Sequence, residues 1–502
     1  MKPPVSRHRL VSCAEHVGPV WTAFALSILL SLIALSAAIT PNDDGMLYVE
    51  TARAFQSEGL SAALQLFDWP FLPILMAAVS SFTGLEVEAS GYLLSTVFIA
   101  GTCSLIVACT REMLPRSGWA AMVVVLTVPA LNNYRDHIIR EFGAWFLLFL
   151  ALWLLLRWAR RPGWAGGLAA QSAICAAALF RLETLIFLAV PVLWQLISIR
   201  HGGGWRRVAM FLLPPLLGGV GVGLLAGVGD AEFGSRVAQQ LNAIDLASKH
   251  DRFFAMAAEI GSQIDNKYAI KQMPTILFFG AFGLLLSKFI SNFGLLIVPG
   301  IYALIRPRLP VLLVSAAPFA IAFAVYAIVP LAFVLDSMFL SSRYVALLNL
   351  LAVPLVSVGL AHLFQRIARW RIPLIAIAVM MGLSNVISTT PPETRMMDAA
   401  TWLKLHGADP SRVFVEPREV IYLVGWPYHG PQAQSIRGRE EALVALASGA
   451  IDLALLDLPS DSPDLQHWAK EKGLRSVERF ADARNRTVHA FVRSAAPALD
   501  HR

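Results

Sequence analysis

The chain has 502 residues, of which 56% are hydrophobic and only 15% are charged, and its mean hydropathy is +0.60. A soluble protein needs more polar residues to cover its core, so this composition predicts a multi-pass membrane protein. The net charge of +7 does not indicate nucleic-acid binding, because the arginines lie in short clusters between apolar runs. The four cysteines have no spacing typical of a disulfide framework or a metal site.

Apolar runs separated by charged loops predict about 11 transmembrane helices, judged by length, charged flanks and parity. Basic clusters occur in every second loop, which places those loops in the cytoplasm and the alternate, acid-rich loops outside. The first run is longer than the apolar region of a signal peptide, so we expect it to remain as the first helix. The expected spans are 18–39, 90–110, 117–131, 142–157, 164–180, 185–199, 208–228, 289–305, 309–329, 344–364 and 372–388.

Two further apolar segments, 69–82 and 274–287, are expected to lie along the outer surface of the membrane as interfacial helices. A crossing by the first of them would move every later arginine cluster to the outside, against the positive-inside pattern. We apply the same reasoning to the second. Both segments are therefore left out of the count of spans.

The sequence predicts a mainly α polytopic membrane domain over residues 1–388 and a small soluble α/β domain over residues 389–502. In the second domain the strand-like runs RVFV, VIYLV and LALLDL alternate with the helical stretches ETRMMDAATWLKLHG and REEALVALASGA. An odd number of crossings places this domain outside. It has no glycine-rich phosphate loop and no paired catalytic motif, so we expect a lid or an acceptor-docking module.

The first outer loop, ITPNDDGMLYVETA, brings two adjacent acids to the point where the chain leaves the bilayer. One explanation is structural, because Asn42 or Asp43 can cap a helix whose first turn favours the next acid, Asp44. The alternative is that one carboxylate faces a cavity as a general base or a metal ligand. Tyr48 lies four residues after Asp44 and would share its helix face.

The second outer loop, NNYRDHIIREFGAW, is rich in ionisable residues for a short connection. A solvated loop explains Arg135 and Asp136, but it does not require Arg140 and Glu141 at the start of an apolar helix. Ionisable groups are unfavourable in or near the bilayer, so these residues indicate a functional site.

Charged residues also interrupt three later outer segments. Arg181 and Glu183 break the apolar run ALFRLETLIF, where they either neutralise each other or act directly. Arg343 and Tyr344 begin a late helix, as a snorkelling anchor or as an anion ligand. The long loop 229–273 carries cations that are solvated or hold a phosphate, namely Lys249, Arg252, Lys267 and Lys271.

Taken in order, these segments resemble the GT-C superfamily of membrane glycosyltransferases, particularly the bacterial relatives of protein O-mannosyltransferases and lipid A aminoarabinose transferases. The segments that carry the resemblance are ITPNDDGMLYVETA, DWPFLPILMAAVSSFTG, REFGAWFLLFLALWLLLR, ALFRLETLIFL, SSRYVALLNLLAVPL and AATWLKLHGADPSRVFVEPREVIYLVG. The sequence departs from the family pattern in two places. It reads Asp68-Trp69-Pro70-Phe71 where many relatives have paired prolines, and it lacks the Trp-Trp-Asp signature of oligosaccharyltransferases.

The resemblance implies a polyprenyl-phosphate-linked sugar donor, used at the outer face of a bacterial cytoplasmic membrane with the active site toward the periplasm. The acceptor is a glycan, a lipid or a protein. By position in the family, the acid that serves the acceptor falls on Asp43 or Asp44, and the acid of the second outer loop on Glu141 or Asp136. The cations and tyrosines named above, together with Glu183, are candidates for substrate binding. The sequence identifies no cofactor, and it leaves open whether a divalent metal ion is needed.

The chemistry fits these residue types. An acceptor hydroxyl needs a carboxylate to accept its proton, and the departing lipid phosphate is best met by arginine or lysine. Attack opposite the phosphate would invert the anomeric centre.

The rival hypothesis is a transporter or flippase, which would require ionisable groups deep within several spans, broken helices and internal repeats. A non-catalytic assembly or receptor protein is a third alternative. The charges lie mainly at the outer ends of the spans, which favours the enzyme.

Overall fold

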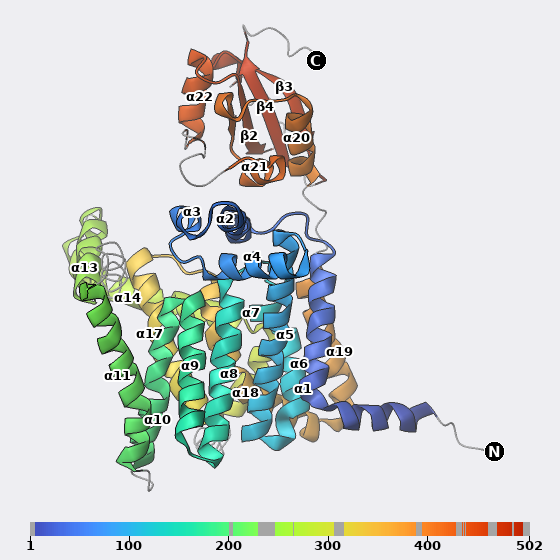
Figure 1. The fold of residues 1–502 in the computed structure, drawn as a ribbon, viewed down its shortest axis with the longest axis vertical. Coiled ribbons are helices and arrows are strands. Elements are labelled where there is room, and N and C mark those ends of the chain that lie inside the picture. Colours follow the sequence, from blue (N-terminus) through green and yellow to red (C-terminus); the bar gives the residue numbers. More distant parts are fainter. Residues whose placement is uncertain are drawn as a thin grey trace. The chain divides into compact units, whose positions relative to one another are not determined.

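The computed structural model describes residues 6–199, 204–228, 246–264, 266–305, 316–387, 394–427, 434, 436, 438–459, 469–483 and 486–494 (Figure 1). The chain forms two compact units. The first comprises Met1–Leu30, Thr96–Arg135 and Arg140–Val386, and the second comprises Ser31–Ser95, Asp136–Ile139 and Ile387–Arg502. Each unit is assembled from several segments, so the division of the chain at residue 388 stays a prediction.

The described residues of the first unit form helices and the short connections between them. Its helices, some of which begin or end in the second unit, are α1 (Ser6–Leu35), α5 (Val87–Met113), η1 (Pro115–Ser117), α6 (Gly118–Thr127), α7 (Pro129–Asn132), α8 (Arg140–Arg160), α9 (Trp164–Phe180), η2 (Leu182–Leu188), α10 (Ala189–Ile199), α11 (Trp205–Val228), α13 (Leu246–Ser262), α14 (Lys267–Ser291), η3 (Gly294–Leu296), α15 (Ile297–Leu304), α17 (Ala317–Ser337), α18 (Ser342–Arg366), η4 (Ala368–Trp370) and α19 (Arg371–Val386).

Within the described residues, seven helical segments are long and apolar enough to cross a membrane. They are Gly18–Leu35, Val87–Met113, Arg140–Arg160, Leu182–Ile199, Ile270–Ser291, Ala317–Ser337 and Ser342–Arg366. Shorter apolar helices add Phe71–Thr83, Trp164–Phe180, Gly294–Leu304 and Arg371–Val386. The expected fold class, a mainly α polytopic membrane protein, is confirmed.

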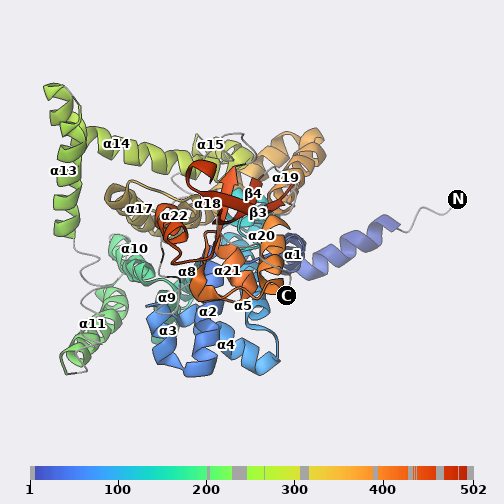
Figure 2. The ribbon, with the colours of Figure 1, turned by 90° about the horizontal axis from the view of Figure 1, so that it is seen from above.

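Several expected spans take a different form. The run 117–131 is divided between α6 and α7 because Pro129 begins a new helix. The run 289–305 comprises the last residues of α14 and the short helices η3 and α15. The segment 274–287 belongs to a 25-residue helix, α14, which is longer than expected. Figure 2 looks down on the structure and shows α14 lengthwise, whereas α8 and α9 run mainly along the line of sight. The prediction that this segment lies along the membrane surface stays a prediction.

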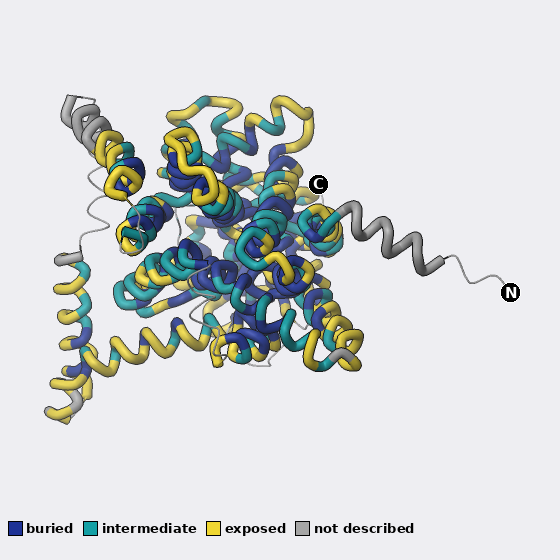
Figure 3. The backbone as a smooth tube through the Cα atoms, turned by 90° about the horizontal axis from the view of Figure 1, so that it is seen from below, coloured by how far each residue is buried: buried dark blue, intermediate teal, exposed yellow. Residues whose placement is uncertain are grey.

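Apolar side chains cover much of the outer face of α14, where Phe279 is 65% exposed and Ile276 is 52% exposed. Figure 3 shows α13 and α14 as predominantly exposed segments, in contrast to the buried helices at the centre of the first unit. A helix with this much exposed apolar surface is suited to contact with lipid.

Close packing in the first unit depends on glycine. A Cβ atom on Gly359 of α18 would lie 1.8 Å from the carbonyl oxygen of Pro299 in α15, and one on Gly143 of α8 would lie 2.4 Å from the ring of Phe180. Small residues allow two helix backbones to approach each other in this way in membrane proteins. The crossing of α15 and α18 fixes the position of the helix that begins at Ser342.

The second unit contains three short helices from the first outer segment, α2 (Asp43–Glu58), α3 (Leu60–Leu66) and α4 (Phe71–Thr83). Gly59 separates α2 from α3 with φ of 85°, and Gly84 ends α4 in the left-handed region that glycine adopts without strain. Asp43 and Asp44 occupy the first turn of α2, where they favour the positive end of the helix dipole.

The C-terminal part of the second unit is the predicted small α/β domain. Its elements are α20 (Thr394–Leu405), η5 (Pro410–Arg412), β1 (Val413–Val415), α21 (Arg418–Val424), α22 (Arg439–Ser448), β2 (Leu453–Pro459), β3 (Leu474–Ala481) and β4 (Arg486–Arg493). The sheet order is β1-β2-β4-β3, with β1 parallel to β2 and the other pairs antiparallel. Two apolar cores cover the two faces of the sheet.

One expectation for this domain is wrong: the run VIYLV is not a strand but forms most of helix α21. Pro417 precedes the helix, and Gly425 ends it in the left-handed conformation with φ of 87°. A run of five apolar residues does not reveal its period, so the flanking proline and glycine decide the structure.

Tyr422 of α21 contacts two residues of the first outer segment within the second unit. Its hydroxyl donates a hydrogen bond to the carboxylate of Glu88, and the guanidinium of Arg53 lies 5.8 Å from the centre of its ring. Burial, together with the hydrogen bond to Glu88, raises the pKa of Tyr422 above its ordinary value. These contacts connect the C-terminal domain to the segment that carries Asp43.

Candidate active site

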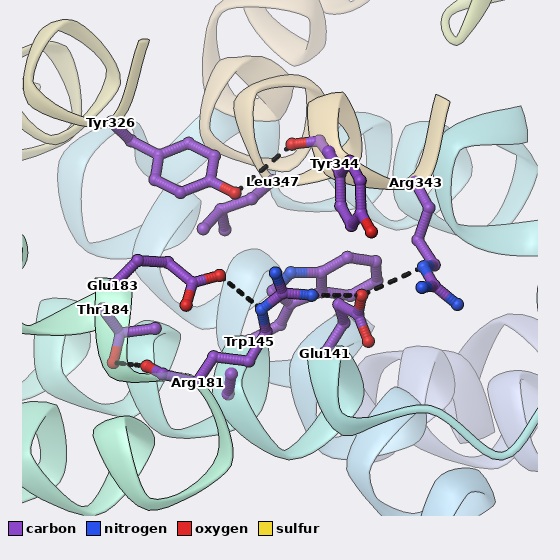
Figure 4. Close-up of a pocket in the computed structure, with 10 residues that line it drawn as sticks. Glu141, Trp145, Arg181, Glu183, Thr184, Tyr326, Arg343, Tyr344 and Leu347 are labelled. Carbon is purple, nitrogen blue, oxygen red and sulfur yellow. Dashed lines mark hydrogen bonds and ion pairs between the residues drawn. The ribbon is translucent and has the colours of Figure 1, made fainter. Parts of the chain in front are cut away.

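Three helix boundaries of the first unit converge on one small pocket. Glu141 lies in the first turn of α8, Arg181 lies between α9 and η2, and Arg343 lies in the first turn of α18. Figure 4 shows the three side chains pointing toward one another, with the Glu141 carboxylate between the two guanidinium groups. The structure thus brings together charges that the sequence places in three separate loops.

The break between α9 and η2 is what places Arg181 in the pocket. Its backbone is extended, with φ of −146° and ψ of 112°, so the helix ends at Phe180 and the chain continues as a 3-10 turn. The carbonyl oxygen of Arg181 accepts both the hydroxyl of Thr184, at 2.8 Å, and the backbone N–H of Thr184, at 3.0 Å. A continuous helix would direct the side chain elsewhere.

Charge pairing fixes the centre of the pocket. Arg181 donates from Nη1 to Glu141 and from Nε to Glu183, and Arg343 Nε lies 3.0 Å from Glu141 Oε1. The side chain of Glu141 is only 5% exposed, whereas those of Arg181 and Arg343 are 21% and 19% exposed. The half-buried Arg140, next in sequence to Glu141, adds to the positive charge acting on the carboxylate. A buried carboxylate is stable only with such partners.

Aromatic residues form one wall of the pocket. Both guanidinium groups lie against the ring of Tyr344, with Arg181 at 5.4 Å and Arg343 at 5.6 Å from its centre. The hydroxyl of Tyr326 donates to the backbone oxygen of Tyr344 at 3.3 Å, and Phe333 packs edge-on against the Tyr344 ring. Contacts of this kind between cations and aromatic rings hold the arginine side chains in place.

The enclosed space is small in this structure. It has room for about one water molecule, and Ala144, Trp145, Thr184 and Leu347 complete its lining. Binding of a larger headgroup therefore requires the side chains of the pocket to move apart.

Two buried asparagines support the start of α18. Asn292 donates from its amide to the backbone oxygen of Ser342 at 2.9 Å and to Oδ1 of Asn349 at 3.2 Å. Asn349 donates in turn to the backbone oxygen of Phe289 at 2.8 Å. These bonds tie the end of α14 to the turn that carries Arg343, and so help to orient its guanidinium group.

The predicted site residues Asp43, Asp44, Tyr48 and Asp136 belong to the second unit. Asp43 is exposed and Asp44 is half-buried, while Tyr48 is buried with its ring 5.5 Å from that of Phe67. Asn42 does not cap α2 with its side chain. Its Oδ1 instead accepts a hydrogen bond from the backbone N–H of Ile138 at 2.9 Å, which joins the first and second outer loops.

Asp136 forms a pair with the neighbouring His137 in the second outer loop, with 2.9 Å between Oδ1 and Nδ1. Burial alone would raise the pKa of Asp136, but the hydrogen bond and charge of His137 outweigh it and lower the pKa below its usual range. Asp136 is therefore a weak base in this arrangement.

Arg135 and the predicted cations of the long outer loop lie apart from the pocket. Arg135 is 1% exposed and donates to Oδ1 of Asn132 and to the backbone and hydroxyl oxygens of Ser27. Lys249 and Arg252 both pair with Asp336, at 3.4 Å and 3.1 Å. Lys271 is exposed, and the side chain of Lys267 lies outside the described residues.

Sequence reasoning missed Tyr326, Trp145 and the asparagine pair. The sequence does contain a signal for Tyr326, Asn292 and Asn349. Each places a polar group within or beside an apolar run, where such a group needs a hydrogen-bond partner. Trp145 gives no such signal. No group of three or more histidine, cysteine, aspartate or glutamate side chains arranged to hold a metal ion occurs among the described residues.

Comparison with solved structures establishes the fold. The oligosaccharyltransferase of Archaeoglobus fulgidus, tethered to an acceptor peptide containing the NVT sequon, aligns over 95% of this chain and 74% of its own, with a TM-score of 0.55 and 12% identity. The same protein in complex with Zn and sulfate has the same coverage and identity and a TM-score of 0.52. ArnT from Cupriavidus metallidurans aligns over 93% of this chain and 97% of its own at 14% identity, but its TM-score of 0.44 is too low to carry weight.

No protein-family model and no curated protein matches the chain. At 12% identity, the likeness to the oligosaccharyltransferase concerns the fold alone. The chain therefore shares its fold with this oligosaccharyltransferase, a fold of the kind that the sequence resemblance led us to expect.

Proposed function

We propose that the protein transfers a sugar from a polyprenyl-phosphate donor to an acceptor hydroxyl at the outer face of a bacterial cytoplasmic membrane. The observation that carries this proposal is the buried Glu141 carboxylate, which lies between Arg181 and Arg343 where three helices of the first unit begin or end. Such a cluster of guanidinium groups at the ends of apolar helices is suited to a phosphate attached to an isoprenoid chain.

The two arginines would stabilise the leaving phosphate. Negative charge grows on its oxygens as the bond to the anomeric carbon breaks, and guanidinium groups that are already oriented need no reorganisation to meet it. Glu141 keeps the two guanidinium groups together before the donor binds. When a phosphate enters, its oxygens compete with Glu141 and Glu183 for the same N–H donors, so the ion pairs exchange partners rather than break.

The acceptor hydroxyl requires a base, and Asp43 or Asp44 is the proposed group. Asp43 is exposed in the first turn of α2, where an acceptor from the aqueous side can reach it. Attack by the hydroxyl on the face opposite the phosphate would invert the anomeric centre. The oligosaccharyltransferase was solved with Zn and sulfate, so a divalent ion belongs among the components of the assay.

The test is turnover of a synthetic polyprenyl-phosphate sugar by the full chain in lipid nanodiscs. Release of polyprenyl phosphate together with a new glycosidic bond is the expected result. The variant Arg343→Ala should lower donor turnover at least tenfold, because it removes a charged group that contacts the phosphate. The matched control is Arg157→Ala, which removes an exposed arginine from the other end of α8.

The general base is tested in the same assay with Asp43→Asn and Asp44→Asn. One of the two should abolish transfer without loss of folded protein, since an amide cannot accept the proton. Wild-type turnover in both variants would remove the first outer loop from the mechanism. Movement of the lipid across the bilayer without a new glycosidic bond would favour the transporter instead.

A further inference from the structure

A cleft of about 390 Å³ lies at one end of the C-terminal sheet in the second unit. Glu416 directly follows β1, and Asp457 lies near the carboxyl end of β2, so both acids come from the end at which the two parallel strands finish. Open sheets with parallel strands bind ligands in the crevice at this end. The helix α21 also begins here (Figure 1).

Charged groups of both signs line the cleft in equal number. The arginines are Arg395, Arg418, Arg439 and Arg486. The acids are Asp43, Glu416, Glu419 and Asp457. A cleft that traps an anion would have an excess of positive charge, whereas this one presents N–H donors and carboxylate acceptors side by side.

Hydrogen bonds fix the floor of the cleft. Arg439 makes two bonds of 3.0 Å to the Glu416 carboxylate and a third, of 2.9 Å, to the backbone oxygen of Asp457. Glu416 also accepts the backbone N–H of Asp457 at 2.9 Å. The buried Arg395 bridges Asp482 and Asp457, with 3.5 Å to the latter. Side chains held in this way lose little entropy when a ligand binds.

Arg418 differs from the arginines of the floor. It is exposed in the first turn of α21 and makes no hydrogen bond or ion pair with the part of the chain that the structure describes. Its five N–H donors therefore face the cleft and the solvent, where a ligand can use them.

We propose that this cleft binds the acceptor, and that the acceptor is a hydroxyl-rich glycan; the role as acceptor rests on the proposed glycosyl transfer. A sugar hydroxyl is both a donor and an acceptor, so it can bond to a guanidinium and a carboxylate at the same time. An electrically balanced, polar cleft matches this chemistry. An acceptor phosphate would face four carboxylates, and an apolar peptide side chain would find little apolar lining.

The position of Asp43 connects the cleft to the reaction. The residue lines the cleft and is one of the two acids proposed as the general base. A glycan bound to the C-terminal domain would therefore present its hydroxyl groups to the carboxylate that is to accept the proton.

The experiment measures binding of the full chain in nanodiscs to an array of neutral and acidic oligosaccharides, with no donor present. The expected result is retention on a subset of neutral oligosaccharides, weakened about tenfold by Arg418→Ala because a hydrogen bond to a charged group is lost. The control is Arg412→Ala, which removes an exposed arginine paired with Asp452 on the same domain but outside the cleft. It should bind as the wild type does.

Three results would overturn the proposal: binding to no oligosaccharide on the array, equal loss in both variants, and retention only of phosphorylated sugars that inorganic phosphate displaces. Because the array contains no donor, its outcome is independent of donor turnover. Glycan binding through the cleft without any turnover would refute the enzyme while leaving the binding site intact. Turnover without glycan binding would support the enzyme and refute the proposed binding site.

Discussion

Arg343 Nε lies 3.0 Å from Glu141 Oε1, although the two residues lie at the starts of different helices of the first unit. The same carboxylate oxygen also accepts a hydrogen bond from Arg181. One buried acid therefore connects α8, α18 and the break after α9. Removing a partner from such a cluster leaves charges that are only partly compensated.

The variant Glu141→Gln tests this connection. It keeps the shape of the side chain but leaves two arginines beside a neutral amide, so we expect a loss of about 3 kcal/mol of stability, within the range for a broken buried ion pair. Thermal unfolding in detergent measures it. The control is Glu112→Gln, whose partner Arg160 is 61% exposed, and it should lose less than about 1 kcal/mol. Equal losses would show that Glu141 is no more important than a surface acid.

The forked geometry of Arg181 gives a second prediction. Its Nε and Nη1 atoms bind Glu183 and Glu141 respectively, and a lysine ammonium on a flexible stem cannot reproduce that fixed spacing. We expect Arg181→Lys to lower donor turnover at least tenfold despite the conserved charge. The comparison is Arg157→Lys, whose residue stacks on Trp153 at 4.8 Å, and which should leave turnover unchanged. Retained turnover in Arg181→Lys would mean that charge alone suffices.

The asparagine pair provides a test of positioning. Asn349→Leu removes the bonds to Asn292 and to the Phe289 backbone, so the first turn of α18 should lose its fixed orientation and donor turnover should fall about tenfold. The matched control is Gln171→Leu, which removes a buried amide that bonds to Phe211 between α9 and α11. Both variants should lose similar thermal stability, but only Asn349→Leu should lose turnover. A parallel loss of both properties in the control would mean that the pair is merely structural.

The crossing of α15 and α18 predicts an intolerant position. Gly359→Ala places a methyl group 1.8 Å from the Pro299 carbonyl oxygen, and a backbone atom cannot move aside as a side chain can. We expect a loss of about 3 kcal/mol, at the upper end for overpacking, together with low yield of folded protein. Gly283→Ala in α14 is the control, since nothing lies within 4 Å of its added methyl group. It should be neutral or slightly stabilising.

Tyr422 gives a prediction for alkaline pH. Its pKa is raised in the folded chain, so its contribution to stability is complete below the ordinary tyrosine value of about 10 and is lost as the pH rises above it. Tyr422→Phe should therefore be about 1 kcal/mol less stable than the wild type at neutral pH, because the bond to Glu88 is absent. This difference should shrink above about pH 10. Thermal unfolding at several pH values measures it, and a constant difference would contradict the assignment.

The sequence was sufficient to find the charges of the pocket but not their partners. Glu141, Arg181 and Arg343 stand out because ionisable groups are unfavourable near apolar runs unless they are paired or functional. Their common contact depends on how three helices pack, which no local pattern contains. Arg135 and Arg140 look equivalent in the same loop, yet Arg135 is buried against Ser27. That difference also arises from tertiary packing.

The C-terminal domain illustrates a different limit. Apolar runs predicted β1 and β2 correctly, because each is short and flanked by polar residues. The same rule failed for α21, where the flanking proline and glycine outweigh the apolar run. The strands β3 and β4 were missed because neither alternates: LRSVERFA is mostly exposed, and RTVHAFVR is buried along almost its whole length although it contains polar residues.

The crosswise direction of α14 bears on how the chain enters the membrane during synthesis. By composition alone, an insertion machinery that selects segments by hydrophobicity would accept Ile270–Ser291 as a span. If α14 instead lies parallel to the bilayer surface, it does not change the direction in which α17, α18 and α19 cross the membrane. Reporter fusions immediately before and after α14 would then report the same compartment, and fusions to the later helices would keep their alternation.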